Sequence, residues 1–199
     1  MQSETPQPTR PKLKKQLRHK PLHDGKSLSL NEFRAWASDD GFKYEWVDGT
    51  LKATTAMKNR ERLLVSRLLR RFAQTKAYQE GGELLPETDT LLAPVNKVRI
   101  PDLAFFTRDE LLQSEKGDEP IPSFVIEIIS PSNTVDEVQT KLADYFNSGV
   151  QVVWEIFPKN KSVRIYNSLK TVKICTDDDV CSAAPALPDF TITPNQLFG

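Results

Sequence analysis

Two carboxylates interrupt apolar segments in the middle of this 199-residue chain. Glu127 stands inside the apolar run at residues 124–129, and Asp102 precedes a second run at residues 103–106. A carboxylate in a buried strand costs free energy unless it is paired, protonated or bound to a metal ion. If the two segments form neighbouring strands, both carboxylates lie in one place. The alternatives are a strand position that faces a solvent cleft for Glu127 and a turn-to-strand junction for Asp102.

The chain offers few other groups for catalysis. Its only histidines, His19 and His23, fall in the N-terminal segment, which excludes a Ser-His-Asp or Cys-His centre in the rest of the chain. Cys175 and Cys181 are too few for a zinc site by themselves, and we expect free thiols rather than a disulfide. Carboxylates therefore remain as the metal ligands, and they suit hard cations such as Mg²⁺ or Mn²⁺.

Lys141 is the cation that could join these carboxylates. It lies on a predicted helix at residues 134–148. Val138 and Tyr145 are three residues before it and four after it, so the lysine stem can border the buried face of the helix. The alternative is an exposed ion pair with Glu137, which would contribute only a few tenths of a kcal/mol.

The N-terminal half of the chain predicts two helices and a hairpin. Ser29 and Glu32 form a capping-box pattern that opens a short helix through about Ala37. The Asp-Gly pair at residues 48–49, between alternating apolar residues, is a strong hairpin signal. From about residue 59 to residue 78, apolar residues follow helical spacing while arginines occupy other faces. This spacing predicts one long basic helix.

The C-terminal half predicts a strand at residues 124–129, a helix at 134–148 and a strand at 150–157. Such a unit forms a right-handed parallel crossover within a mixed sheet. Further strands are expected within residues 84–106 and 163–175. These elements together predict an α/β (α+β) fold in which helices flank one central mixed β-sheet.

The N-terminal segment differs in composition from the rest. Residues 1–26 contain seven Lys or Arg residues and two acidic residues, so this segment is formally +5 and the remainder −5. Its few large apolar residues predict a disordered basic arm, followed by one domain at residues 27–199. Lys14 and Lys15 could contact nucleic-acid phosphate, with a solubilising tail as the alternative. No segment has the pattern of a signal peptide or a membrane span, so we expect a cytoplasmic protein.

Several short motifs occur in a fixed order along residues 28–195. They are Tyr44 to Leu51, Ile100-Pro101-Asp102-Leu103, Val125 to Ser132, Lys141, Tyr145, Gly149-Val150 and Val153-Trp154. Each motif is weak by itself, but the combination is specific. In this order it resembles the Uma2 family, whose members are classed as restriction endonucleases within the PD-(D/E)XK nuclease superfamily.

The resemblance implies a restriction-endonuclease-like core with a metal site at Asp102 and Glu127. The superfamily motif places a lysine two residues after the second acid, where this chain has Ile129. Similar sequences carry that lysine on the following helix, and Lys141 matches the shifted position. Glu45 matches an early acidic position of the family. It would then be a third catalytic carboxylate, or it would lie on the exposed side of the hairpin.

The residues and the resemblance together predict an endonuclease that hydrolyses DNA phosphodiester bonds with Mg²⁺ or Mn²⁺. DNA is the expected partner, and a homodimer would suit cleavage of both strands. Arg60, Arg67 and Arg71 on the predicted long helix are candidates for contacts with the DNA backbone, the alternative being a solvated helix face. Two other functions stay open: an impaired nuclease-fold protein that binds nucleic acid or another partner, and a metal-free hydrolase of sugars.

Overall fold

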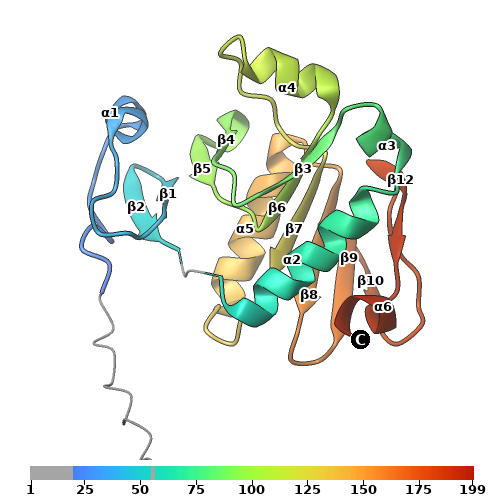
Figure 1. Cartoon of the computed structure of the whole chain (residues 1–199). Coiled ribbons are helices and arrows are strands. Elements are labelled where there is room, and N and C mark those ends of the chain that lie inside the picture. The colour runs from blue at the N-terminus through green and yellow to red at the C-terminus, as the bar shows by residue number, and fades with distance from the viewer. Residues whose placement is uncertain (1–19, 55–56) are drawn as a thin grey trace, which may run out of the picture.

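The computed structural model describes residues 20–54 and 57–199, which fold around a six-stranded mixed sheet (Figure 1). Its strands, in sheet order, are β10 (Thr171–Cys175), β9 (Ser162–Ser168), β8 (Val152–Phe157), β7 (Phe124–Ile128), β6 (Leu103–Phe106) and β3 (Glu83–Pro86). Strands β7 and β8 pair in parallel, and the other neighbours in this sheet pair antiparallel. The predicted fold class, a mixed sheet with flanking helices, is confirmed.

Helix α5 (Val135–Ser148) makes the parallel crossover between β7 and β8. Its start is fixed by a capping box, in which the Thr134 side chain accepts a hydrogen bond from the backbone N–H of Glu137, and the Glu137 carboxylate accepts one from the backbone N–H of Thr134. Its end is set by Gly149, whose φ of 104° lies in the left-handed region. The predicted boundaries of this helix are confirmed.

The alternation of side chains along β7 separates the two faces of the central sheet. Phe124 and Ile126 join the larger apolar core, together with residues of α2 (Asn59–Phe72), whereas Val125 packs with residues of α5. Glu127 has the same parity as Val125, so the pleat directs it to the α5 face. Figure 1 shows α2 crossing the opposite face.

The prediction of one long helix at residues 59–78 is wrong after residue 72. Helix α2 ends at Phe72, and a separate short helix, α3 (Lys76–Gln79), follows. Thr75 makes the break because its hydroxyl donates to the Phe72 carbonyl oxygen (2.7 Å) and accepts from the backbone N–H of Tyr78 (3.2 Å). One side chain thus satisfies backbone groups at the ends of both helices.

A smaller four-stranded sheet lies beside the central sheet, in the order β2 (Thr50–Ala53), β1 (Tyr44–Val47), β5 (Lys97–Arg99) and β4 (Thr90–Leu92). The predicted hairpin between β1 and β2 is confirmed, with positive φ at both residues of its turn, Asp48 and Gly49. Helix α1 (Leu30–Ala35) has the predicted capping box. The 3₁₀ turn η1 (Ala93–Val95) follows β4, and both contact α5.

The remaining elements complete the outer layers. Helix α4 (Arg108–Ser114) follows β6, while β11 (Cys181–Ala183) and β12 (Leu187–Ile192) form a two-stranded sheet before α6 (Pro194–Phe198). Cys175 and Cys181 are buried free thiols, as expected. Among the described helices, none has the length and apolar character needed to cross a membrane.

Residues 20–26, which the sequence assigns to the basic arm, contact the hairpin of β1 and β2. The backbone N–H of Gly25 donates to the Leu51 carbonyl oxygen (2.8 Å), and the N–H of Leu51 donates to the carbonyl oxygen of Lys26 (2.8 Å). The His23 ring contacts Trp36 and Tyr44 edge-on. These contacts attach residues 20–26 to the hairpin. The rest of the predicted arm, with Lys14, Lys15 and His19, lies outside the described residues.

Candidate functional site

The four predicted catalytic residues meet in a cleft of about 570 Å³ where the small sheet, β7 and α5 come together. Asp102, Glu127, Lys141 and Glu45 all line it. They come from four elements: the turn before β6, strand β7, helix α5 and strand β1. Residues separated by almost one hundred positions in the sequence therefore share one cavity.

Asp102 and Glu127 are brought together by the pairing of β6 and β7. Leu103 lies opposite Ile126 in this antiparallel pair, so the residues beside them, Asp102 and Glu127, are also neighbours. The Asp102 Oδ2 atom accepts a hydrogen bond from the backbone N–H of Ile128 (2.6 Å). The proximity expected from the sequence is present.

Lys141 reaches this carboxylate pair from α5. Its Nζ atom lies 3.3 Å from Glu127 Oε1 and 2.8 Å from Glu45 Oε1. The hydroxyl of Tyr145, one helical turn further along, donates to Glu127 Oε1 (2.5 Å). Glu137, the alternative ion-pair partner of Lys141, instead accepts the hydrogen bond from the start of the helix. The Lys141 ammonium group thus lies beside Glu127, and its catalytic role stays a prediction.

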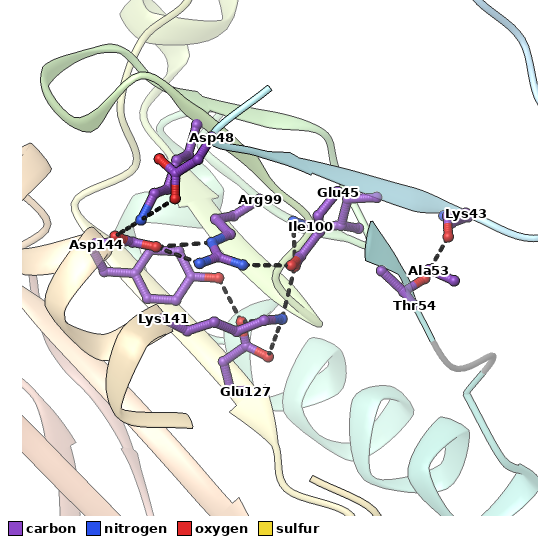
Figure 2. A network of polar contacts seen from close by, with 12 residues as sticks. Lys43, Glu45, Asp48, Ala53, Thr54, Arg99, Ile100, Glu127, Lys141 and Asp144 are labelled. Atoms are coloured by element: carbon purple, nitrogen blue, oxygen red, sulfur yellow. Dashed lines mark hydrogen bonds and ion pairs between the residues drawn. The ribbon is translucent and has the colours of Figure 1, made fainter. Parts of the chain in front are cut away.

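Glu45 is buried, with 4% of its surface exposed, so it does not lie on the exposed side of the hairpin. Its Oε1 atom accepts a hydrogen bond from the backbone N–H of Ile100 (3.1 Å) and contacts Lys141. Its Oε2 atom accepts one from Arg99 Nη1 (2.8 Å). Figure 2 shows Glu45 between the Arg99 guanidinium and the Lys141 ammonium.

The environment separates the pKa values of the three carboxyl groups. Burial and the nearby charge of Glu127 raise the pKa of Asp102 to about 7. Burial also raises the pKa of Glu127, against the opposing effects of Lys141 and Tyr145. Burial acts in the same direction on Glu45, but the positive charges of Lys141 and Arg99 outweigh it and lower its pKa. Glu45 is therefore the carboxylate most firmly held in the ionised form.

Burial and the neighbouring charges act on the pKa of Lys141 in opposite directions. Burial favours its neutral form, but the negative charges of Glu127 and Glu45 outweigh burial and raise its pKa. Burial and Glu127 also raise the pKa of Tyr145, which keeps its hydroxyl a hydrogen-bond donor. The site therefore favours the charged ammonium form of Lys141, which lies between Glu45 and Glu127.

Two of the predicted DNA-contacting arginines have structural partners. Arg67 donates from Nη1 to the carbonyl oxygen of Leu197 (2.7 Å), and Arg71 donates from Nε to that of Thr191 (2.5 Å). Both side chains thereby hold the C-terminal segment against α2, and neither lies on a helix face that contacts only solvent. Arg60 is exposed beside Glu61, which lines the cleft. Contact of these arginines with DNA stays a prediction.

Arg99 and Asp144 are site residues that sequence reasoning missed. Arg99 joins Glu45 to Asp144, and both charged partners are buried. A charged residue in a predicted strand, three positions before Asp102, was the available signal. Its partner on α5 is 45 positions away, so only the packing of α5 on the small sheet reveals the interaction.

The donor groups are of the chemical type that suits a hard divalent cation. Asp102, Glu127 and Glu45 supply carboxylate oxygens, the ligands that Mg²⁺ and Mn²⁺ prefer. Within residues 20–54 and 57–199, no three acidic, His or Cys side chains are arranged to surround a metal ion together. The Lys141 ammonium lies between Glu45 and Glu127 and already neutralises part of their charge.

Comparisons with known proteins show the family of this chain and a similar fold. The model of the Uma2 family, described as "Putative restriction endonuclease", matches residues 30–195. The chain is also similar to a solved structure from Anabaena variabilis ATCC 29413, described as "a putative nuclease belonging to DUF820", with a TM-score of 0.74. That pair shares 17% sequence identity over 86% of this chain and 97% of the other, so the likeness shows the fold alone. Among curated proteins, none matches the chain. Since the family model spans most of its length, the chain belongs to the Uma2 family.

Proposed function

We propose that this protein is an endonuclease that hydrolyses DNA phosphodiester bonds with Mg²⁺ or Mn²⁺. The observation that carries the proposal is the meeting of Asp102, Glu127 and Lys141 in one cleft. Two carboxylates brought together by a pair of neighbouring strands, and a lysine, are the groups of the PD-(D/E)XK motif. Membership of a family described as restriction endonucleases supports the same class of substrate.

Asp102 and Glu127 would hold the divalent ion, with Glu45 as a third carboxylate beside them. When bound, such an ion polarises the scissile phosphate and lowers the pKa of coordinated water. Tyr145 fixes one oxygen of Glu127 by its hydrogen bond, which limits rotation of that carboxylate. Lys141 would donate a hydrogen bond to a phosphate oxygen and offset the negative charge that develops during phosphoryl transfer.

The charge of the cleft supports a requirement for divalent cations. Its lining includes three basic side chains and eight acidic ones: Asp24, Glu45, Glu61, Glu87, Asp102, Glu127, Asp136 and Glu137. A surface of this charge repels the DNA phosphates by itself. Bound cations would reverse that repulsion at the point where cleavage takes place.

We therefore expect DNA affinity to rise when divalent cations are present. The measurement is fluorescence anisotropy of a labelled duplex in Ca²⁺ and in EDTA, with NaCl added to match the ionic strength and separate specific binding from screening. Ca²⁺ also takes oxygen ligands but accepts a less constrained geometry than Mg²⁺. Equal affinity in both buffers would mean that DNA binds elsewhere, as expected of a binding protein with an impaired site.

The proposed activity is tested with end-labelled DNA duplexes, single strands and RNA of the same sequence. We expect the wild-type protein to cleave DNA internally in Mg²⁺ or Mn²⁺ and to stop when EDTA is added. Cleavage that continues in EDTA would contradict the role of the carboxylates as metal ligands. Cleavage of RNA alone would mean that the substrate is RNA rather than DNA, while the proposal of a metal site would still hold. A homodimer also stays a prediction, and cutting of both strands at a fixed offset would support it.

A further inference from the structure

Arg99 is a charged residue buried inside the protein, with 6% of its surface exposed. Its guanidinium donates to two carboxylates: from Nη1 to Glu45 Oε2 (2.8 Å), and from Nε (3.0 Å) and Nη2 (2.5 Å) to Asp144 Oδ2. A buried guanidinium is costly without such partners. The planar group can satisfy two carboxylates in a fixed relative geometry, which a lysine cannot do.

Asp144 anchors this arrangement to α5. It follows Lys141 by three residues, so both side chains lie on the same face of the helix. Its other oxygen, Oδ1, accepts a hydrogen bond from Lys97 Nζ (2.8 Å), and Lys97 lies on the same strand, β5, as Arg99. The Asp144 carboxylate of helix α5 thus accepts hydrogen bonds from two cations of strand β5, Lys97 and Arg99.

The Glu45 carboxylate is consequently held at both oxygens. Lys141 and the backbone N–H of Ile100 contact Oε1, while Arg99 contacts Oε2 (Figure 2). Rotation of this carboxylate would break at least one of these contacts. Its direction in the cleft is therefore set by residues that do not themselves belong to the Asp102, Glu127 and Lys141 group.

We infer that Arg99, anchored by Asp144, is a positioning residue that fixes Glu45 for binding of the divalent cation. The inference rests on the proposed function and goes beyond it, because it assigns a role to a guanidinium outside the nuclease motif. Arg99 acts through Glu45 and does not contact substrate. Partners of this kind, behind a metal ligand, determine the orientation of that ligand and the affinity for the ion.

The test is the affinity of the full chain for Mn²⁺, measured by titration calorimetry without DNA. Arg99→Lys keeps the charge but loses the two-carboxylate geometry, and we expect Mn²⁺ to bind roughly 10- to 100-fold more weakly. Arg164→Lys is the matched control, because it makes the same change on β9, where the guanidinium lies over the ring of Phe157 (4.5 Å to the ring centroid) and outside the cleft. Mn²⁺ affinity of Arg164→Lys should equal that of the wild type. Circular dichroism shows that each variant is folded at the assay temperature.

A double-mutant cycle separates positioning from general support of the fold. If Arg99 acts through Glu45, then Arg99→Lys adds no further loss of Mn²⁺ affinity in a Glu45→Gln background. Equal losses in both backgrounds, or wild-type affinity in Arg99→Lys, would overturn the inference and leave the proposed function intact. Failure of the wild-type protein to bind Mn²⁺ would instead overturn the proposed function, and the inference with it.

Discussion

Glu127→Gln is expected to lose DNA cleavage and to bind Mn²⁺ far more weakly than the wild type. Glutamine keeps the size of the side chain and can still accept hydrogen bonds from Tyr145 and Lys141, but it removes the negative charge that a divalent cation requires. Removal of a direct ligand should exceed the roughly 100-fold cost of removing an outer partner. The measurement is the initial rate of DNA cleavage together with a Mn²⁺ titration.

Glu155→Gln is the matched control for this prediction. Glu155 lies opposite Glu127 on the neighbouring strand β8, and it is also buried. It shares a small cavity of about 30 Å³ with Glu127, Lys141 and Tyr145, but it does not line the 570 Å³ cleft, and its Oε2 atom accepts a hydrogen bond from Tyr166 (3.2 Å). The same chemical change one strand away should leave cleavage within a few fold of the wild type. Equal losses in both variants would indicate damage to the sheet rather than loss of a metal ligand.

The metal-free protein is expected to lose stability as the pH rises from about 4 to about 7. Burial and the charge of Glu127 raise the pKa of Asp102 from 3.8 to about 7, so the folded state binds a proton that the unfolded state has released. Between these two pH values, ionisation therefore favours unfolding. The full effect corresponds to about 4 kcal/mol at pH well above 7. Glu127, whose pKa burial also raises, contributes with the same sign.

Asp102→Asn should remove much of this pH dependence. In EDTA at pH 8, urea unfolding of the variant should show a higher free energy of unfolding than the wild type, although the variant lacks a predicted catalytic residue. Such an exchange of stability for activity is common at functional sites. A variant with the same pH dependence as the wild type would show that the Asp102 carboxyl group is not destabilised by its surroundings.

Asp40 provides a control in which the dependence of stability on pH has the opposite sign. Burial would raise its pKa, but hydrogen bonds from Tyr44, Ser38 and the backbone N–H of Leu22 outweigh burial and lower it. Its ionised form therefore stabilises the folded state at neutral pH, and that contribution is lost as the pH falls through the acidic range. Asp40→Asn should accordingly destabilise the protein at pH 8, while Asp102→Asn stabilises it.

The elements that carry Glu127 and Lys141 could be predicted because their signals are local. The apolar run of β7, the cap at Thr134 and the glycine at position 149 lie within about 25 residues and agree with one another. The break between α2 and α3 carried no glycine or proline. It depends on a single threonine hydroxyl, and helical spacing of the apolar residues continues across it.

The rest of the site depends on contacts between distant segments. From the sequence, the exposed side of the hairpin was an alternative position for Glu45, and its burial follows from the packing of β1 and β5 against α5. Residues 20–26 were assigned to the arm because Leu22 is their only large apolar residue. The backbone of this segment nevertheless forms hydrogen bonds with β2. Strands β11 and β12 are short. Prolines at positions 185 and 188 interrupt the alternation of apolar and polar residues from which strands are predicted.

The central claim is that Asp102, Glu127 and Lys141 form a metal-dependent nuclease centre. Its most direct test is nicking of supercoiled plasmid by the wild type, Glu127→Gln and Glu155→Gln in Mg²⁺, in Mn²⁺ and in EDTA. The predicted result is open-circular DNA from the wild type and Glu155→Gln with either metal, and from neither protein in EDTA. Glu127→Gln should leave the plasmid supercoiled. Nicking by Glu127→Gln at the wild-type rate, or an intact plasmid with a wild-type protein that binds DNA, would contradict the claim.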